Sequence, residues 1–247
     1  MGWIFAIFLG LIPAFVYVLS IYLWYPFVGE VALQRDSQEQ KKRRLCSATA
    51  CAIASCILCL TLGVNFEDKG IAFNQPCLHL LSIVKSAIAT VVLFAGPLIQ
   101  GFVYENLNAA SVFTTFHYKS VLSWNAYIIS PILEEIVFRG QVISIVRHVI
   151  GEDEASVIKL MISSTIIFVI AHAHHLLEKE ANLMQTVGQL FISSLFGALS
   201  SFLFIRTRSV LGPIISHIFC NLHGPPPIQR IRNINQVKKY GHFILLG

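Results

Sequence analysis

Residues 132–140 read ILEEIVFRG and place two adjacent carboxylates and one guanidinium inside a segment that is otherwise apolar. The surrounding stretch, 124–149, is long enough to cross the roughly 30 Å of hydrocarbon in a bilayer. Charged groups at that depth are costly and for that reason indicate function. On a helix Glu135 and Arg139 stand four residues apart and can pair, whereas Glu134 points about 100° away. We expect Glu135 and Arg139 to support the helix and Glu134 to be free for chemistry.

The composition of the chain is that of an integral membrane protein. Of its 247 residues 55% are hydrophobic and only 13% charged, and the mean hydropathy of +0.68 lies outside the range of ordinary soluble domains. Strand-like alternation of polar and apolar residues is scarce, which favours a helical bundle over a barrel. The net charge of +5 arises from basic residues clustered in loops. Retention of those loops in the cytosol explains them better than binding to nucleic acid does.

Seven apolar runs predict an all-α, polytopic transmembrane bundle of seven to eight helices. The runs cover 3–25, 45–64, 78–102, 124–149, 156–177, 184–205 and 210–222. A basic loop at about 28–44 follows the first run and is expected in the cytosol. We interpret 1–247 as a single membrane domain with catalytic helices at about 121–222 and a basic tail at 223–247. The last residues of that tail are too few to span a bilayer, so an eighth helix would be incomplete.

Polar residues near the ends of two later runs can join Glu134 in one cavity. His172 lies near the end of the fifth run, and His217 and Asn221 lie four residues apart on one face of the seventh. In the predicted topology Glu134, His172 and His217 all fall near the midplane or in the cytosolic half of their helices. Taken singly, a histidine on an apolar face is more often a hydrogen-bonded core residue. The shared depth on three helices favours a common site.

Three motifs resemble a known family. In chain order they are Glu134-Glu135-x-x-x-Arg139, Phe168-x-x-x-His172 and His217-x-x-x-Asn221. Together they resemble the type 2 CAAX prenyl proteases, the Ras-converting endopeptidases of the endoplasmic reticulum, within the broader family of CAAX and bacteriocin-processing membrane proteins. The resemblance covers about 96–221, and the Ala-His-Ala-His-His stretch that includes His175 is similar to the eukaryotic branch.

The resemblance implies an intramembrane endopeptidase that removes the last three residues of a farnesylated or geranylgeranylated CAAX protein, such as a Ras-like small GTPase. It further implies a multi-pass protein of the endoplasmic reticulum membrane, with its active site open to the cytosol and with no metal or other cofactor. Its partners would be the lipidated substrate and the lipid bilayer, and not nucleic acid.

The residue types fit such a hydrolysis, because attack by water needs a base and preformed donors for the oxyanion. Glu134 is the candidate base, and His172 can orient the water and return a proton to the leaving amine. His217 and Asn221 are candidate oxyanion donors. Glu135 and Arg139 are expected to hold the helix, and Phe168 and His175 complete the supporting set.

Three other readings of the same residues stay open. Both glutamates can be structural, each paired with a basic residue of another helix. Glu134, His172 and His217 can instead supply three ligands to zinc, although no H-E-x-x-H helix is present. The chain can also be a non-catalytic scaffold, or a transporter that uses its intramembrane carboxylates as an ion site.

Overall fold

The computed structural model of the chain describes residues 2–23, 38–64, 70–71, 76–95, 98–99, 120–151, 156–177 and 183–223. All regular structure in these ranges is helical, in agreement with the predicted all-α bundle. The single-segment helices are α1 (Trp3–Tyr22), α2 (Gln38–Thr61), α3 (Pro76–Leu93), α9 (Val157–His172), α10 (Leu183–Thr207) and α11 (Leu211–His223). A short 3-10 turn, η5 (Ala173–Leu177), extends α9. The predicted basic tail lies outside the described residues beyond His223.

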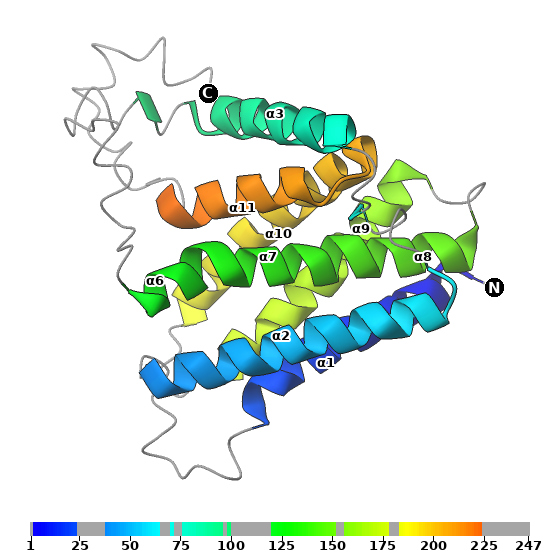
Figure 1. Ribbon diagram of the computed structural model, residues 1–247, viewed down its shortest axis with the longest axis horizontal. Helices are drawn as coiled ribbons and strands as arrows, with labels where there is room; N and C mark the ends of the chain where they lie inside the picture. Colours follow the sequence, from blue (N-terminus) through cyan, green and yellow to red (C-terminus); the bar gives the residue numbers. More distant parts are fainter. Residues whose placement is uncertain are drawn as a thin grey trace.

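The glutamate motif lies on one continuous helical run between 121 and 150. It consists of α6 (Val121–Trp124), η3 (Asn125–Ile129), α7 (Ser130–Glu135), η4 (Ile136–Gln141) and α8 (Val142–Ile150). Both η3 and η4 are π-helical, so the two glutamates stand on a short α-helical segment between two wider turns. Single π-helical turns inside helices are frequent at functional sites. The run occupies the centre of the bundle in Figure 1.

The other helices surround this run. On one side α1 and α2 pack against it and against each other, and on the other side α11 packs against α7 and α3 (Figure 1). The pair α9 and α10 completes the bundle. The central core cluster brings together buried residues of α1, α2, η4 and α9, including Tyr17, Ala52, Phe138 and Phe168. The charged motif therefore lies where most of the helices meet.

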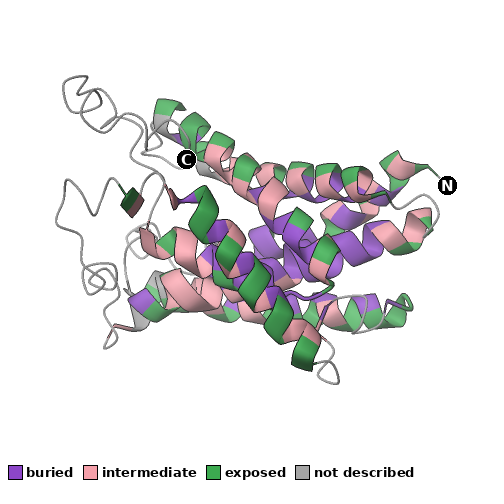
Figure 2. Cartoon of the chain, turned by 90° about the horizontal axis from the view of Figure 1, so that it is seen from above, coloured by how far each residue is buried: buried purple, intermediate pink, exposed green. Residues whose placement is uncertain are grey.

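The exterior of the bundle is apolar, as expected for a surface that faces lipid. Exposed large side chains cover the outer faces of several helices, for example Phe8 on α1, Val92 on α3 and Phe191 on α10, whereas the purple buried positions of Figure 2 lie inside. Four helices are each long and apolar enough to cross a membrane: α1, α2, α3 and α10. The protein is therefore a multi-pass membrane protein.

Two of the predicted spans differ from the observed helices. The second was expected to begin at 45, after a basic loop at about 28–44, but α2 begins at Gln38, so Arg43 and Arg44 lie in its first two turns. The third was expected to reach 102, but α3 ends at Leu93, shortly before the Gly96-Pro97 pair of the sequence. Helical residues are described again at 95 and at 98–99, where the Leu98 N–H donates to the Phe94 carbonyl oxygen at 2.9 Å. The seventh agrees with the expected 210–222, since α11 covers Leu211–His223; its 13 residues have a length of about 20 Å, less than the roughly 30 Å of a full hydrocarbon core.

Small and hydroxylated residues bring α11 close to α3. Thr90 and Ser216 share a hydrogen bond of 2.7 Å between their hydroxyl oxygens, and a Cβ added at Gly212 would lie 3.0 Å from the Ser82 carbonyl oxygen. Small residues allow this approach in membrane helices, where packing and interhelical hydrogen bonds drive association. Because His217 directly follows Ser216, this contact fixes the depth at which the histidine enters the bundle.

Candidate active site

The two adjacent glutamates have different surroundings. The Glu135 side chain is fully buried, and its Oε1 lies 3.1 Å from Arg139 Nη1, which confirms the predicted i,i+4 pair. The Glu134 side chain keeps 21% of its surface exposed, and no arginine or lysine of the described residues forms an ion pair with it. The α-helical geometry of α7 separates them, since consecutive residues differ by about 100° around the axis. One carboxylate is neutralised in the core, and the other stays partly exposed.

Arg139 is completely buried, and its guanidinium contacts two further helices. Its Nη2 lies 3.5 Å from the Gly197 carbonyl oxygen of α10, and its guanidinium carbon lies 4.3 Å from the centre of the Phe168 ring. Stacking on an aromatic face and pairing with a carboxylate suit arginine in a dry interior. Phe168, expected in a supporting role, thus covers the guanidinium.

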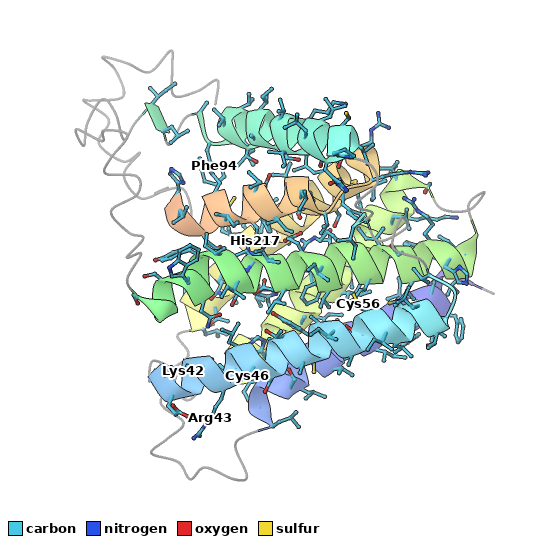
Figure 3. All side chains as sticks on the ribbon, viewed as in Figure 1. Lys42, Arg43, Cys46, Cys56, Phe94 and His217 are labelled. Carbon is cyan, nitrogen blue, oxygen red and sulfur yellow. The ribbon has the colours of Figure 1, made fainter. Side chains whose placement is uncertain are left out.

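Two imidazoles converge on the partly exposed carboxylate. The Nε2 atoms of His172 and His217 each lie 3.9 Å from Oε2 of Glu134. A separation of 3.9 Å is too long for a direct hydrogen bond but allows one water molecule to bridge the groups. The histidines come from α9 and α11 and the carboxylate from α7, so three helices contribute to one point, as the sequence predicted. Figure 3 labels His217 where α11 passes the central run.

The other nitrogen of each imidazole also has a partner. His172 Nδ1 lies 2.9 Å from the Phe168 carbonyl oxygen, one helical turn earlier. His217 Nδ1 lies 2.7 Å from Glu135 Oε1. Because a carbonyl and an ion-paired carboxylate only accept hydrogen bonds, both Nδ1 atoms are donors. In each neutral ring the lone pair is then on Nε2, the atom that lies 3.9 Å from Glu134 Oε2.

Sequence reasoning missed two contacts of this site. The first is the bond between His217 and Glu135, which makes Glu135 a partner of the histidine as well as of the arginine. The second comes from Ser200 of α10, whose Oγ donates to Glu135 Oε2 at 2.6 Å. Residue spacing could not have revealed either contact, because each joins helices that are distant along the chain.

Two of the predicted site residues are placed differently from the rest. Asn221 lies one turn after His217, and its Nδ2 donates to the Ala126 carbonyl oxygen of η3 at 3.3 Å. This bond ties the end of α11 to the central run and leaves the second amide proton of Asn221 for another acceptor. His175 lies in η5, and its side chain is outside the described residues.

The spacing of the donors suits water better than zinc. Two ligands of a tetrahedral zinc ion, each about 2.0–2.1 Å from the metal, stand about 3.3 Å apart. The distances of 3.9 Å between Glu134 and the two histidines are wider than this. Among the described residues no group of three or more His, Cys, Asp or Glu side chains is arranged to hold a metal ion.

Known proteins are similar over the part of the chain that contains the site. The family model of the Rce1-like type II CAAX prenyl endopeptidases matches residues 116–223, which include every candidate site residue. The human CAAX prenyl protease 2 is 28% identical over 234 residues, 86% of this chain and 68% of the human protein. The probable CAAX prenyl protease 2 of Schizosaccharomyces pombe is 28% identical over 249 residues, 94% of this chain and 86% of the yeast protein.

A plant relative is similar over a shorter stretch. The CAAX prenyl protease 2 of Arabidopsis thaliana is 37% identical over 127 residues, 47% of this chain and 38% of the plant protein. No solved structure matches the chain at a significant level. With an apolar bundle around a carboxylate and two imidazoles, these relatives identify the chain as a membrane-embedded peptidase. Its residues 116–223 are similar to the Rce1-like type II CAAX prenyl endopeptidases.

Proposed function

We propose that the protein removes the C-terminal tripeptide from prenylated CAAX proteins by means of a water molecule held between Glu134, His172 and His217. The observation that carries this mechanism is the pair of 3.9 Å distances that join two imidazole Nε2 atoms to one carboxylate oxygen. The substrate class follows from the relatives, which are named as CAAX prenyl proteases. Farnesylated and geranylgeranylated Ras-like GTPases are proposed as substrates on the same ground.

The lone pairs around this point determine how water is bound. With both Nδ1 atoms acting as donors, neutral His172 and His217 each present an Nε2 lone pair, and Glu134 adds a third acceptor. Water has only two protons, so it satisfies all three groups when one of them carries a proton. We place that proton on His217, because the Glu135 carboxylate, 2.7 Å from its Nδ1, stabilises an imidazolium there.

Hydrolysis then follows in two steps. Glu134 accepts a proton from the water as its oxygen attacks the carbonyl carbon between the prenylated cysteine and the next residue, while His172 accepts the other water proton as a hydrogen bond. The carbon–nitrogen bond of the tetrahedral intermediate then breaks, and the proton that Glu134 accepted from the water passes to the leaving amine. The products are a prenyl-cysteine carboxylate and a free tripeptide. Acid and base catalysis of this kind contributes about 10²–10⁴-fold to the rate.

The oxyanion of the intermediate needs donors that are fixed before it forms. In the proposed protonation state His217 Nε2–H is such a donor, and the second amide proton of Asn221, one turn further along α11, is another. The bond from Asn221 to the Ala126 carbonyl oxygen holds the carboxamide in place. Loss of one oxyanion donor typically costs about 10²–10³-fold in turnover.

The orientation of the bundle supports a site that is open to the cytosol. Lys42 and Arg43, at the beginning of α2, lie at the end of the bundle where α11 also ends (Figures 1 and 3). Basic residues beside a membrane span favour the cytosolic side. We propose that the protein is in the endoplasmic reticulum membrane, with 1–247 as one domain, catalytic helices at 121–222 and the prenyl chain in lipid or between helices.

The test is release of the tripeptide from a farnesylated CAAX peptide by the purified protein in lipid nanodiscs. We expect Glu134→Gln to lower turnover by about 10²–10⁴-fold, because the amide cannot take the water proton. Glu39→Gln, which removes an exposed carboxylate paired with Arg43 on α2, is the matched control and should retain activity. Full activity in Glu134→Gln would refute the assignment of the base.

A further inference from the structure

The two oxygens of the buried Glu135 carboxylate have different partners. Oε1 accepts from Arg139 Nη1 at 3.1 Å and from His217 Nδ1 at 2.7 Å. Oε2 accepts from the Ser200 hydroxyl at 2.6 Å. Ser200 is itself completely buried on α10. The carboxylate therefore joins helices α7, α10 and α11, with the serine at one end of the network and the histidine of the hydrolytic centre at the other.

Arginine does not fix the rotation of this carboxylate. A guanidinium that holds a carboxylate in a defined plane usually donates two parallel hydrogen bonds, one to each oxygen. Here Nη1 approaches Oε1, Nη2 is directed to the Gly197 carbonyl oxygen at 3.5 Å, and Nε has no hydrogen-bond partner among the described residues. Within the described part of the chain, the hydrogen bond that we find on Oε2 comes from Ser200.

We propose that Ser200 is a positioning residue for hydrolysis, which acts through Glu135 on His217. Its hydroxyl holds Oε2 on the side of α10, so that Oε1 stays directed to His217 Nδ1 and the Nε2 of the ring stays directed to Glu134. Without the hydroxyl, the carboxylate can rotate into a two-oxygen pair with Arg139 and withdraw Oε1 from the histidine. The inference rests on the proposed function, because it assigns His217 to the reaction.

A purely structural role for Ser200 makes a different prediction. If the hydroxyl only satisfies a buried carboxylate, its loss lowers stability and leaves the reaction of the folded protein unchanged. If it positions His217, turnover falls while substrate binding stays the same, because Ser200 is fully buried and cannot contact the substrate. An interaction that acts only in the transition state changes kcat and not KM.

The neighbouring Ser201 offers a matched control. It is equally buried on the same helix, but its Oγ donates to the carbonyl oxygen of Gly197, one turn earlier in α10, at 2.7 Å. Removal of this hydroxyl leaves the Glu135 carboxylate with its serine partner. Ser201→Ala therefore reproduces the loss of a buried hydroxyl without the proposed effect on His217.

The experiment compares Ser200→Ala, Ser200→Thr and Ser201→Ala with the unaltered protein in nanodiscs. With the farnesylated peptide, Ser200→Ala should lower kcat about tenfold to a hundredfold and change KM by less than about twofold, as expected for loss of a hydrogen bond to a charged group. Ser200→Thr, which keeps the hydroxyl, should recover most of kcat. Ser201→Ala should retain it. A kcat of Ser200→Ala within about twofold of the original, or an equal loss in Ser201→Ala, overturns the proposal.

A second measurement does not depend on activity. In protein labelled with 15N-histidine, the Nδ1–H signal of His217, assigned by its absence in His217→Gln, reports the bond to Glu135. This signal should be sharp in the unaltered protein and in Ser201→Ala, and broadened or shifted in Ser200→Ala. An unchanged signal in Ser200→Ala overturns the proposal whatever the turnover. An unaltered protein that releases no tripeptide would refute the proposed function, and the histidine signal would still show whether Ser200 controls His217.

Discussion

Removal of the Arg139 guanidinium should destabilise the protein strongly, and simultaneous removal of the Glu135 charge should cost less than the two single losses added together. Both side chains are fully buried, and their charged atoms are 3.1 Å apart. At an effective dielectric constant of about 20, two unit charges at this distance attract by about 5 kcal/mol. Breaking a buried pair by removal of one partner typically costs about 3–5 kcal/mol, because the other charge stays behind without compensation.

A double-mutant cycle separates this effect from loss of packing. Arg139→Met and Glu135→Gln should each lower the free energy of unfolding by about 3–5 kcal/mol. The double variant leaves no uncompensated charge, so we expect it to be more stable than the sum of the single losses predicts, with a coupling of about 2–3 kcal/mol. Tripeptide release should fall in all three variants, because each of them removes or displaces the carboxylate beside His217.

The measurement is reversible unfolding in mixed micelles of mild detergent and SDS, followed by far-UV circular dichroism. The exposed pair of Glu39 and Arg43 on α2 has the same i,i+4 spacing, at 3.4 Å, and serves as the control. Surface pairs of this kind contribute about 0–1 kcal/mol, so the control cycle should show little coupling. Strictly additive losses in Arg139→Met and Glu135→Gln would show that the buried pair does not stabilise the bundle, and would refute the reasoning.

Three further predictions concern the water, the metal and the helix contact. Glu134→Gln should retain the melting temperature of the unaltered protein while its turnover of the farnesylated peptide falls about 10²–10⁴-fold, and a parallel loss of folding would contradict its role as base. Turnover should persist after dialysis against a strong zinc chelator. Activity that is lost on dialysis and then restored by zinc would show that the protein is a zinc-dependent protease. Gly212→Leu should destabilise the protein by about 1–3 kcal/mol, since even a Cβ meets the Ser82 carbonyl oxygen at 3.0 Å. Gly188→Leu, at a position where nothing lies within 4 Å, should have little effect in the same thermal unfolding assay.

The sequence predicted the parts of this protein that depend on local spacing. A guanidinium four residues after a carboxylate predicted the pair of Glu135 and Arg139, and the apolar runs predicted the helices within a few residues at most ends. The meeting of Glu134 with His172 and His217 was predicted from depth, because residues at similar depths on adjacent helices can share a cavity. Both predictions depend on helical periodicity along the chain and on the free-energy cost of placing a charged side chain in an apolar segment.

The parts that the sequence could not predict depend on how distant helices rotate against each other. Ser200 is one of several serines on α10, and nothing in its immediate neighbours distinguishes it from Ser201. Only the packing of α10 against η4 and α9 turns one hydroxyl to the carboxylate and the other to its own helix. The π-helical turns on both sides of α7 likewise have no periodicity that an apolar pattern would show.

The two adjacent glutamates have different roles in the site. Oxygens of Glu135 accept from arginine, histidine and serine, so three of the roughly four lone-pair positions of this carboxylate are occupied inside the bundle. Glu134, one residue earlier, has no arginine or lysine partner among the described residues and keeps part of its surface exposed. A single acid could not both neutralise the buried guanidinium and accept a proton from water, because each role needs the opposite environment. Exchange of these environments, for example by a one-residue deletion before Glu134, would place the paired carboxylate at the water and leave an unpaired charge in the core, at the buried position of Leu133.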